Sequence, residues 1–170
     1  MPPEGGFVRN ILSIPMDVQV VQLDRLRIVM LRHVGPYEGL ASAFDRLFEW
    51  VEANDVPVQR TIGIYYDNPE FVPADRLKSA ACAEIPIDYI MRNRGGLDIE
   101  LGDIAAGPYA VTRYVGPYEN MEPAWAEFTK HIEGRLMREI SDKPAFEVYV
   151  NDVSDTPPAQ LITELYMPLV

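Results

Sequence analysis

The stretch "RHVGPYEGL" at residues 32–40 returns as "RYVGPYENM" at residues 113–121, which is 113 − 32 = 81 positions later. In each copy a β-rich run stops at Gly-Pro, and an apolar stripe with helical spacing follows. Proline suits such a turn because its φ angle is already fixed. The doubled turn therefore predicts that the chain contains two copies of one structural unit.

Each copy reads as strand, helix, strand, strand. The first strands are predicted at 24–34 and 107–115, the middle strands within 60–69 and 144–153, and the last strands near 76–87 and 160–170. The first helix is expected to end near Asn54, and Asn120 is a candidate N-cap for the second. The apolar stripes that predict the two helices are Leu40, Phe44, Leu47, Phe48 and Val51, and then Met121, Trp125, Phe128, Ile132 and Leu136.

One such unit has too small a core to be stable alone, so two copies should pack about a pseudo-twofold axis. The predicted fold class is α+β, with an antiparallel sheet and two main helices that flank a ligand groove. Residues 18–170 form a single domain, with repeat one at about 18–90 and repeat two at about 98–170. Residues 1–17 are expected to be a flexible leader or a linker remnant, and a short strand is expected near 97–101.

Composition and charge exclude several classes of function. Fifteen Lys and Arg against 26 Asp and Glu give a formal net charge of −11, which would repel a nucleic-acid backbone. The chain has no apolar run long enough for a membrane span and no secretion signal, so a cytoplasmic location is expected. Cys82 is the only cysteine, which excludes an intrachain disulfide and favours a reducing compartment.

The two copies differ most at one position in the middle strand. Aligning Tyr65 with Tyr149 gives an offset of 84, and 147 − 84 = 63 then places Glu147 opposite Gly63. Strand alternation puts Glu147 and Tyr149 on the same face. If that face is buried, the carboxylate needs a cation or hydrogen-bond donors, and Gly63 leaves room for a ligand. The alternative is that this face is exposed and Glu147 is an ordinary surface residue.

Five motifs in order resemble the GyrI-like small-molecule-binding family, which is also called the AraC-type effector-binding domain. They are "HVGPYEGL", "IGIYYDNP", "YAVTRYVGPYE", "PAFEVYVND" and "TELYMPL", and together they span nearly all of residues 18–169. The resemblance implies a fold of two strand-helix-strand-strand units. Family members include drug-sensing domains of transcription regulators, proteins named for DNA gyrase inhibition, and hydrolases of reactive cyclopropane-bearing toxins.

The resemblance implies that Glu147 is the acidic residue of a pocket for cationic aromatic ligands. Position in the predicted elements gives the candidates for the aromatic walls: Tyr149 on the same strand face, Tyr65 on the equivalent strand, Phe44 and Trp125 on the two helices, and Tyr166 as a weaker candidate. The helix stripes favour a structural role for Phe44 and Trp125, and both stay candidates because the two helices border the groove. The tyrosines of the doubled "GPYE", Tyr37 and Tyr118, are expected to pack each turn against its own sheet.

Three functions remain open at this point. The first is a binding module for amphipathic aromatic organic cations, either free-standing or as the effector domain of a regulator whose DNA-binding region these 170 residues do not include. The second is a hydrolase in which Glu147 acts as general acid or base. The third is inhibition of DNA gyrase through protein contact. His33 and His131 fit no metal motif, and neither cofactor nor metal is expected.

Overall fold

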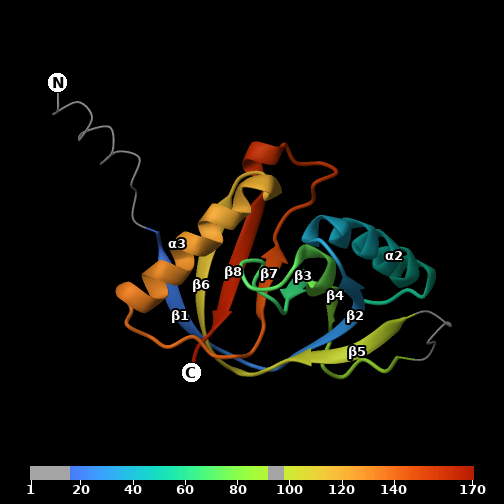
Figure 1. The fold of residues 1–170 in the computed structure, drawn as a ribbon. Helices are drawn as coiled ribbons and strands as arrows, with labels where there is room; N and C mark the ends of the chain where they lie inside the picture. Colours follow the sequence, from blue (N-terminus) through green and yellow to red (C-terminus); the bar gives the residue numbers. More distant parts are fainter. Residues whose placement is uncertain (1–15, 92–97) are drawn as a thin grey trace.

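The computed structural model describes residues 16–91 and 98–170. The expected leader therefore lies outside the described residues, apart from its last two positions. In the described ranges the chain forms an antiparallel eight-stranded sheet in the order β1-β6-β8-β7-β3-β4-β2-β5, with two α-helices on one face (Figure 1). The elements are β1 (Val18–Leu23), β2 (Leu26–Val34), α2 (Leu40–Ala53), β3 (Arg60–Tyr65), β4 (Lys78–Ile85), β5 (Ile99–Ile104), β6 (Gly107–Val115), α3 (Met121–Gly134), β7 (Ala145–Tyr149) and β8 (Ile162–Pro168).

The α+β class and the predicted strand-helix-strand-strand order are confirmed. Helix α2 ends where it was expected to end, because Asn54 donates its side-chain amide to the Trp50 carbonyl at 2.9 Å. Asn120 occupies the N-cap position of α3, but its side chain makes no capping hydrogen bond. The predicted N-cap position is therefore confirmed, and the cap is made without a side-chain hydrogen bond.

The doubled turn has the same backbone solution in both halves. Gly35 and Gly116 have φ angles of 128° and 149°, which residues other than glycine rarely adopt. The Gly35 amide donates to the Leu77 carbonyl at 2.8 Å, and the Gly116 amide donates to the Leu161 carbonyl at 2.9 Å. Each turn is thereby fixed to the segment that leads into the last strand of its own unit.

Each unit begins with a strand that pairs with a strand of the other unit. Strand β1 pairs with β6 and strand β5 pairs with β2, so Val18 faces Thr112 while Ile99 faces Leu31. The two pairs are equivalent in the repeat, because 99 − 81 = 18 and 31 + 81 = 112. The sequence predicted a short strand near β5 but missed β1 as a separate strand, because neither run shows locally which strand will be its partner.

The exchange of first strands makes the sheet curl. Strands β1 and β2 are six positions apart in the strand order, which is roughly 29 Å across a flat sheet. The chain from Leu23 to Leu26 can span only about 10 Å. The two edges of the sheet must therefore approach one another at this end, and the sheet encloses an apolar core that includes Ile28, Ile62 and Phe146.

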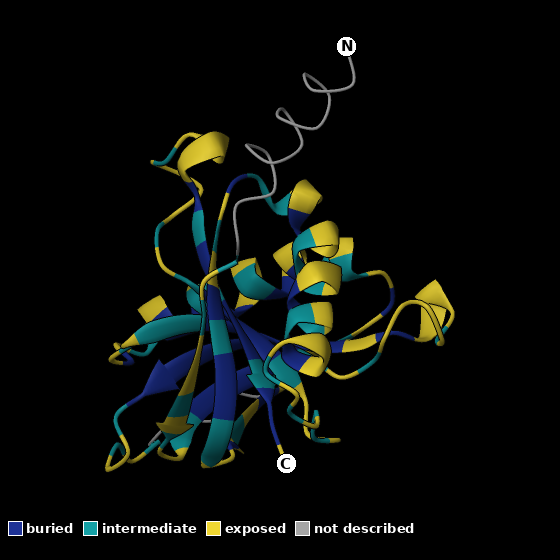
Figure 2. Ribbon diagram, turned by 90° about the vertical axis from the view of Figure 1, so that its left-hand side faces the viewer, coloured by how far each residue is buried: buried dark blue, intermediate teal, exposed yellow. Residues whose placement is uncertain are grey.

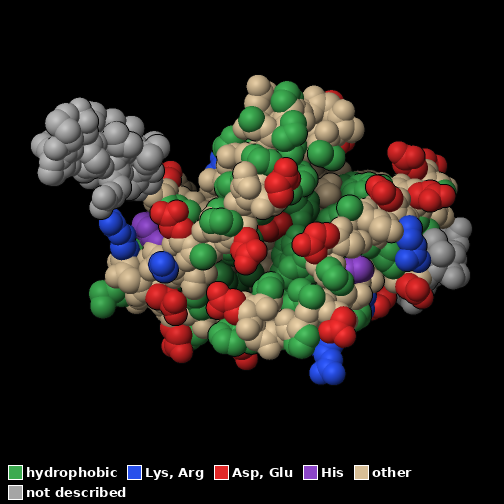
Figure 3. Space-filling model, turned by 45° about the horizontal axis from the view of Figure 1, so that its top comes forward, with side chains coloured by type: hydrophobic (Ala, Val, Ile, Leu, Met, Phe, Trp, Pro, Cys, Tyr) green, Lys and Arg blue, Asp and Glu red, His purple; other side chains and the backbone are tan. Residues whose placement is uncertain are grey.

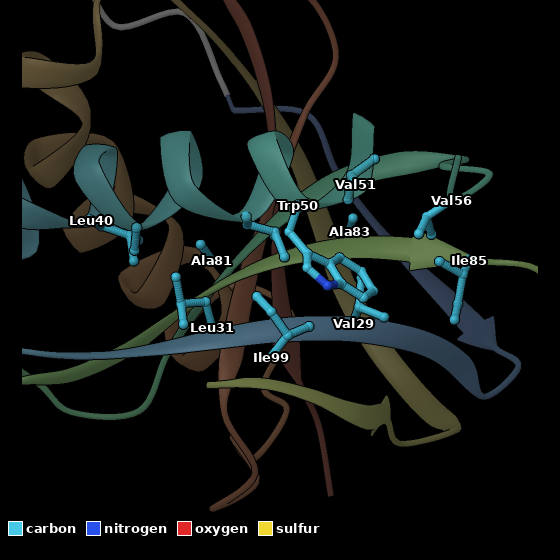
Figure 4. Close-up of a cluster of buried hydrophobic side chains, with 12 residues drawn as sticks. Val29, Leu31, Leu40, Trp50, Val51, Val56, Ala81, Ala83, Ile85 and Ile99 are labelled. Atoms are coloured by element: carbon cyan, nitrogen blue, oxygen red, sulfur yellow. The ribbon is translucent and has the colours of Figure 1, made fainter. Parts of the chain in front are cut away.

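The other face of the sheet is covered by the helices. Helix α2 buries Leu40, Trp50 and Val51 against β2, β4 and β5 (Figure 4). Helix α3 buries Phe128 and Ile132 against β6 and β8 in a separate cluster. The outward faces of both helices are exposed, whereas the central strands are largely buried (Figure 2). Strands β7 and β3 lie between the strands under α3 and the strands under α2 (Figure 1). They carry the site described next.

Candidate functional site

Glu147 lies on the pseudo-twofold axis of the fold. The register of β3 against β7 pairs Thr61 with Tyr149, Gly63 with Glu147, and Tyr65 with Ala145. The repeat offset of 84 relates Thr61 to Ala145 and Tyr65 to Tyr149, so it exchanges the first and third pairs. The same offset relates Gly63 to Glu147, so this pair is its own equivalent. The residues at the centre of the repeat are thus a glycine and a carboxylic acid.

The Glu147 side chain is buried, with only 5% of the residue exposed. This rules out the alternative that Glu147 is an ordinary surface residue. Its Oε1 accepts hydrogen bonds from the Tyr149 hydroxyl at 2.8 Å and the Tyr65 hydroxyl at 3.0 Å, and its Oε2 accepts one from the Trp125 indole at 2.7 Å. The Tyr65 and Tyr149 hydroxyl oxygens are themselves 2.8 Å apart. Three residues expected from the sequence therefore meet at the carboxylate.

Gly63 makes this arrangement possible by having no side chain. A Cβ atom at position 63 would lie 2.6 Å from the Tyr149 hydroxyl and 3.2 Å from the Tyr65 hydroxyl. Both distances are shorter than ordinary van der Waals contact, so any larger residue would push at least one hydroxyl aside. The space opposite Glu147 is thus filled by the two phenol groups that bind the carboxylate.

Further aromatic rings surround the two tyrosines. Phe44 on α2 packs edge-on against Tyr149, with 5.6 Å between ring centroids. Tyr118 contacts Tyr149 at 5.6 Å, and Tyr37 contacts Tyr65 at 4.9 Å. Each of these two tyrosines packs its turn against a strand of its own unit, as expected, and also borders the site. The sequence analysis did not assign them to the site, although their exact repetition in "GPYE" was a signal that could have indicated it.

Tyr166 is the one candidate that lies apart from the others. In the register of β7 with β8, Phe146 pairs with Tyr166 while Glu147 pairs with Leu165, so Tyr166 points to the opposite face of the sheet. There it stacks on Phe146 with 4.5 Å between centroids, inside the enclosed apolar core. The expectation that Tyr166 belongs with the aromatic walls around Glu147 is corrected by this register.

The surface on this side of the molecule is hollowed between the two helices (Figure 3). Hydrophobic side chains gather in the hollow between the two helices, and acidic side chains stand around it (Figure 3). None of the salt bridges between described residues includes Glu147. The residues that the structure describes contain no cluster of three or more His, Cys, Asp or Glu side chains suited to hold a metal ion. In the same ranges no helix is long and apolar enough to cross a membrane.

Burial raises the pKa of Glu147 above its ordinary value of 4.5, although the hydrogen bonds from Trp125, Tyr149 and Tyr65 act in the opposite direction. Burial and the nearby Glu147 also hold the pKa of Tyr65 and Tyr149 well above 10. Both phenols therefore keep their protons at neutral pH and serve as donors. The carboxyl group is therefore the group in this cluster that changes its charge at the lowest pH.

Glu147→Gln is expected to raise the free energy of unfolding at neutral pH by on the order of 1 kcal/mol. The folded protein binds more protons than the unfolded chain between pH 4.5 and the raised pKa, so wild-type stability falls as pH rises through this window. Glutamine has no charge to desolvate, and its amide can donate to the tyrosine oxygens while its carbonyl accepts from Trp125. Urea unfolding of both proteins at several pH values measures the difference, which should be small near pH 4.5 and grow above it. A constant difference at every pH would contradict this assignment.

Comparison with known proteins agrees with the geometry. Residues 16–170 match the GyrI-like small molecule binding domain. A DNA gyrase inhibitor of Citrobacter koseri is 33% identical over 158 residues, which cover 91% of this chain and 98% of that protein. A DNA gyrase inhibitor of Citrobacter rodentium is 30% identical over 81% of this chain and 87% of that protein.

Solved structures show the same fold at low sequence identity. The C-terminal domain of EcmrR is 14% identical, with a TM-score of 0.77 over 92% of this chain and 99% of that domain. SAV2435, solved with bound tetraphenylphosphonium, is 16% identical, with a TM-score of 0.62 over 91% of this chain and 94% of that protein. A hydrolase from Listeria innocua is 12% identical, with a TM-score of 0.63 over 96% of this chain and 98% of that protein. With the family pattern matched from the first described strand to the last residue, the chain belongs to the GyrI-like small-molecule-binding domain family.

Proposed function

We propose that this protein binds amphipathic organic cations that carry aromatic groups, with Glu147 as their counter-ion. The observation that carries the proposal is a single buried carboxyl group on the pseudo-twofold axis, which is held by neutral donors and makes no salt bridge among the described residues. A buried carboxylate without a cation is costly to desolvate. A ligand cation would supply the missing charge.

Charge is the largest single term in this proposal. A cation about 4 Å from a carboxylate gains roughly 4 kcal/mol at the effective dielectric constant of a protein. A contact with an aromatic face adds about 0.5–2 kcal/mol. Tyr65, Tyr149, Trp125, Phe44, Tyr37 and Tyr118 offer several such contacts from both units. The carboxylate would select for positive charge, while the rings would accept ligands of varied shape.

Trp125 occupies the position that a ligand would need. Its indole donates to Glu147 Oε2 from α3, the helix at the edge of the hollow, and its side chain is only partly buried. We propose that Trp125 turns away when a cation approaches Oε2, whereas Tyr65 and Tyr149 stay on Oε1. The structure of SAV2435 with tetraphenylphosphonium shows that one protein of this fold binds a cation of the proposed class.

Titration with tetraphenylphosphonium and with tetraphenylborate tests the proposal, because the two ions have nearly the same shape and opposite charge. Wild-type protein is expected to bind the cation and not the anion. Glu147→Gln should weaken cation binding by about 10- to 100-fold, the usual range for a lost charge-assisted contact. Tryptophan fluorescence is the readout, since Trp125 lies at the site and Trp50 is buried between α2 and the sheet.

Glu164→Gln is the matched control for this experiment. Glu164 is a carboxylate on β8 that faces the other side of the sheet and pairs with Arg113 at 3.3 Å. Its replacement should leave cation affinity unchanged. Equal affinities of wild type and Glu147→Gln, or equal binding of the two ions, would show that Glu147 is not the counter-ion.

Hydrolysis of a reactive cyclopropane is the second candidate function. Burial raises the pKa of Glu147, which suits a general acid or base, and the Tyr65 and Tyr149 hydroxyls could donate to the substrate oxygen that takes up the electron pair of the broken ring C–C bond while water adds to the ring carbon. The test is incubation with an electrophilic cyclopropane and mass spectrometry of the products. A product one water heavier, formed by wild type and not by Glu147→Gln, would support turnover at this site.

Inhibition of DNA gyrase is a separate candidate that rests on the names of two relatives and on the net charge of −11. An acidic surface could compete with DNA for a basic partner. A supercoiling assay with purified gyrase tests this directly. Inhibition that persists in Glu147→Gln would place the inhibitory surface away from the carboxylate site.

A further inference from the structure

The oxygen atoms around Glu147 form a closed triangle. Glu147 Oε1 lies 2.8 Å from the Tyr149 hydroxyl and 3.0 Å from the Tyr65 hydroxyl, and the two hydroxyls lie 2.8 Å from each other. All three distances are within hydrogen-bond range. Three hydrogen bonds in this triangle need three protons, one for each side.

An ionised Glu147 leaves the triangle one proton short. Each phenol has a single hydroxyl proton, and a carboxylate can only accept. With two protons, one of the three sides must bring two lone pairs together beside a carboxyl group that is only 5% exposed. A protonated carboxyl group supplies the third proton, so that each oxygen donates once and accepts once. Oε2 remains free to accept from Trp125, as the structure shows.

The surroundings of Glu147 also favour the neutral form. The titratable groups that face it are tyrosines: Tyr65 on β3, Tyr149 on its own strand β7, and Tyr118 in the turn before α3, with Tyr37 behind Tyr65. Helix α3 presents the neutral indole of Trp125, α2 presents Phe44 against Tyr149, and Leu165 on β8 and Gly63 on β3 are its strand neighbours. Asp152, which lies near Tyr118, is an exposed surface residue. Burial accordingly raises the pKa of Glu147.

We propose that the ligand-free protein holds Glu147 as a neutral carboxylic acid, and that binding of a permanent organic cation expels this proton to the solvent. The inference rests on the proposed function and adds how that site is regulated. The carboxyl O–H bond breaks, the proton passes to water or buffer, and the ligand's positive charge takes its place. The net charge of the occupied site therefore equals that of the empty site.

This exchange makes affinity depend on pH. Below the pKa of Glu147 in the free protein, affinity for a permanent cation should rise toward tenfold per pH unit, because one proton must leave for each cation bound. Above that pKa the dependence should vanish. An uncharged weak base behaves differently, since it can take the proton from Glu147 inside the site and release none.

Isothermal titration calorimetry with tetraphenylphosphonium tests the coupling. Wild-type protein is titrated at several pH values from about 5 to 8, the range in which a raised carboxyl pKa is found. Each pH uses two buffers with different ionisation enthalpies. The slope of observed enthalpy against buffer ionisation enthalpy gives the number of protons released, which should approach one at the acidic end and fall toward zero at the alkaline end. Glu147→Gln, measured at higher protein concentration, should release none.

A second measurement needs no ligand. Infrared spectra of the free protein should show the carbonyl band of a protonated, buried carboxyl group at acidic pH, lost with rising pH and absent from Glu147→Gln at every pH. Addition of tetraphenylphosphonium at acidic pH should remove this band from the wild type.

The outcomes separate this inference from the proposed function. Cation binding without proton release at any pH would overturn the inference and leave the proposed function intact. Failure of the wild type to bind the cation would overturn the proposed function and the coupling together. In that case the infrared band would still decide whether Glu147 is neutral in the free protein.

Discussion

Gly63→Val is expected to destabilise the protein by about 3 kcal/mol and to abolish the binding of tetraphenylphosphonium. The first added carbon would already lie 2.6 Å from the Tyr149 hydroxyl and 3.2 Å from the Tyr65 hydroxyl. These hydroxyls cannot retreat without leaving Glu147, because they meet at the same carboxyl oxygen. Urea unfolding gives the loss of stability, and calorimetry at a temperature where the variant is folded gives the affinity.

Gly134→Ala is the control for the effect of adding carbon to a glycine. A Cβ at Gly134, the last residue of α3, would meet nothing within 4 Å, and its replacement should leave binding unchanged and stability equal or slightly higher. Gly63→Ala should fall between wild type and Gly63→Val. Full cation affinity in Gly63→Val would show that the two phenols are not needed for the site.

Phe146→Ala is expected to cost about 3–5 kcal/mol of unfolding free energy, because it removes the centre of the enclosed core. Phe146 is 1% exposed, stacks on Tyr166 at 4.5 Å and meets Tyr109 edge-on at 5.5 Å. For a chain of this size the loss corresponds to a fall of roughly 10 °C in the midpoint of thermal unfolding. Differential scanning calorimetry measures it.

Phe71→Ala provides the comparison for Phe146→Ala. Phe71 is 81% exposed, so the same truncation should change stability by less than about 0.5 kcal/mol. Cation binding should be weaker in Phe146→Ala even at low temperature, since residue 146 precedes Glu147 on β7 and helps to fix that strand. A stability loss below about 1 kcal/mol for Phe146→Ala would mean that the sheet can collapse around the vacated space.

The sequence predicted the two helices, their place after the doubled turn and the strand that carries Glu147, because all of these depend on local periodicity. It also placed Glu147 and Tyr149 on one face correctly, since alternation within a strand is a local property. The exchange of β1 and β5 between units was missed because it depends on partners distant in sequence. The face of Tyr166 depends on the register of β7 with β8, which neither strand encodes alone.

The burial of Glu147 was the point that the sequence left undecided. Both faces of β7 have apolar or aromatic residues, so alternation could not show which face water reaches. Glu147 is buried because Trp125 on α3 and two tyrosines cover it. The tyrosine hydroxyls fit there because Gly63 has no side chain. Comparing the two copies did identify position 147, because a residue that differs between two otherwise similar units is not explained by their shared core.

The register that places Gly63 opposite Glu147 has a consequence for the ancestry of the fold. In a homodimer of single units, both residues facing each other across the twofold axis would be encoded by the same codon. Such an assembly would carry either two carboxyl groups in mutual repulsion or none at all. A single acid at the centre of symmetry requires two halves that can differ in sequence, as the two repeats of this chain do.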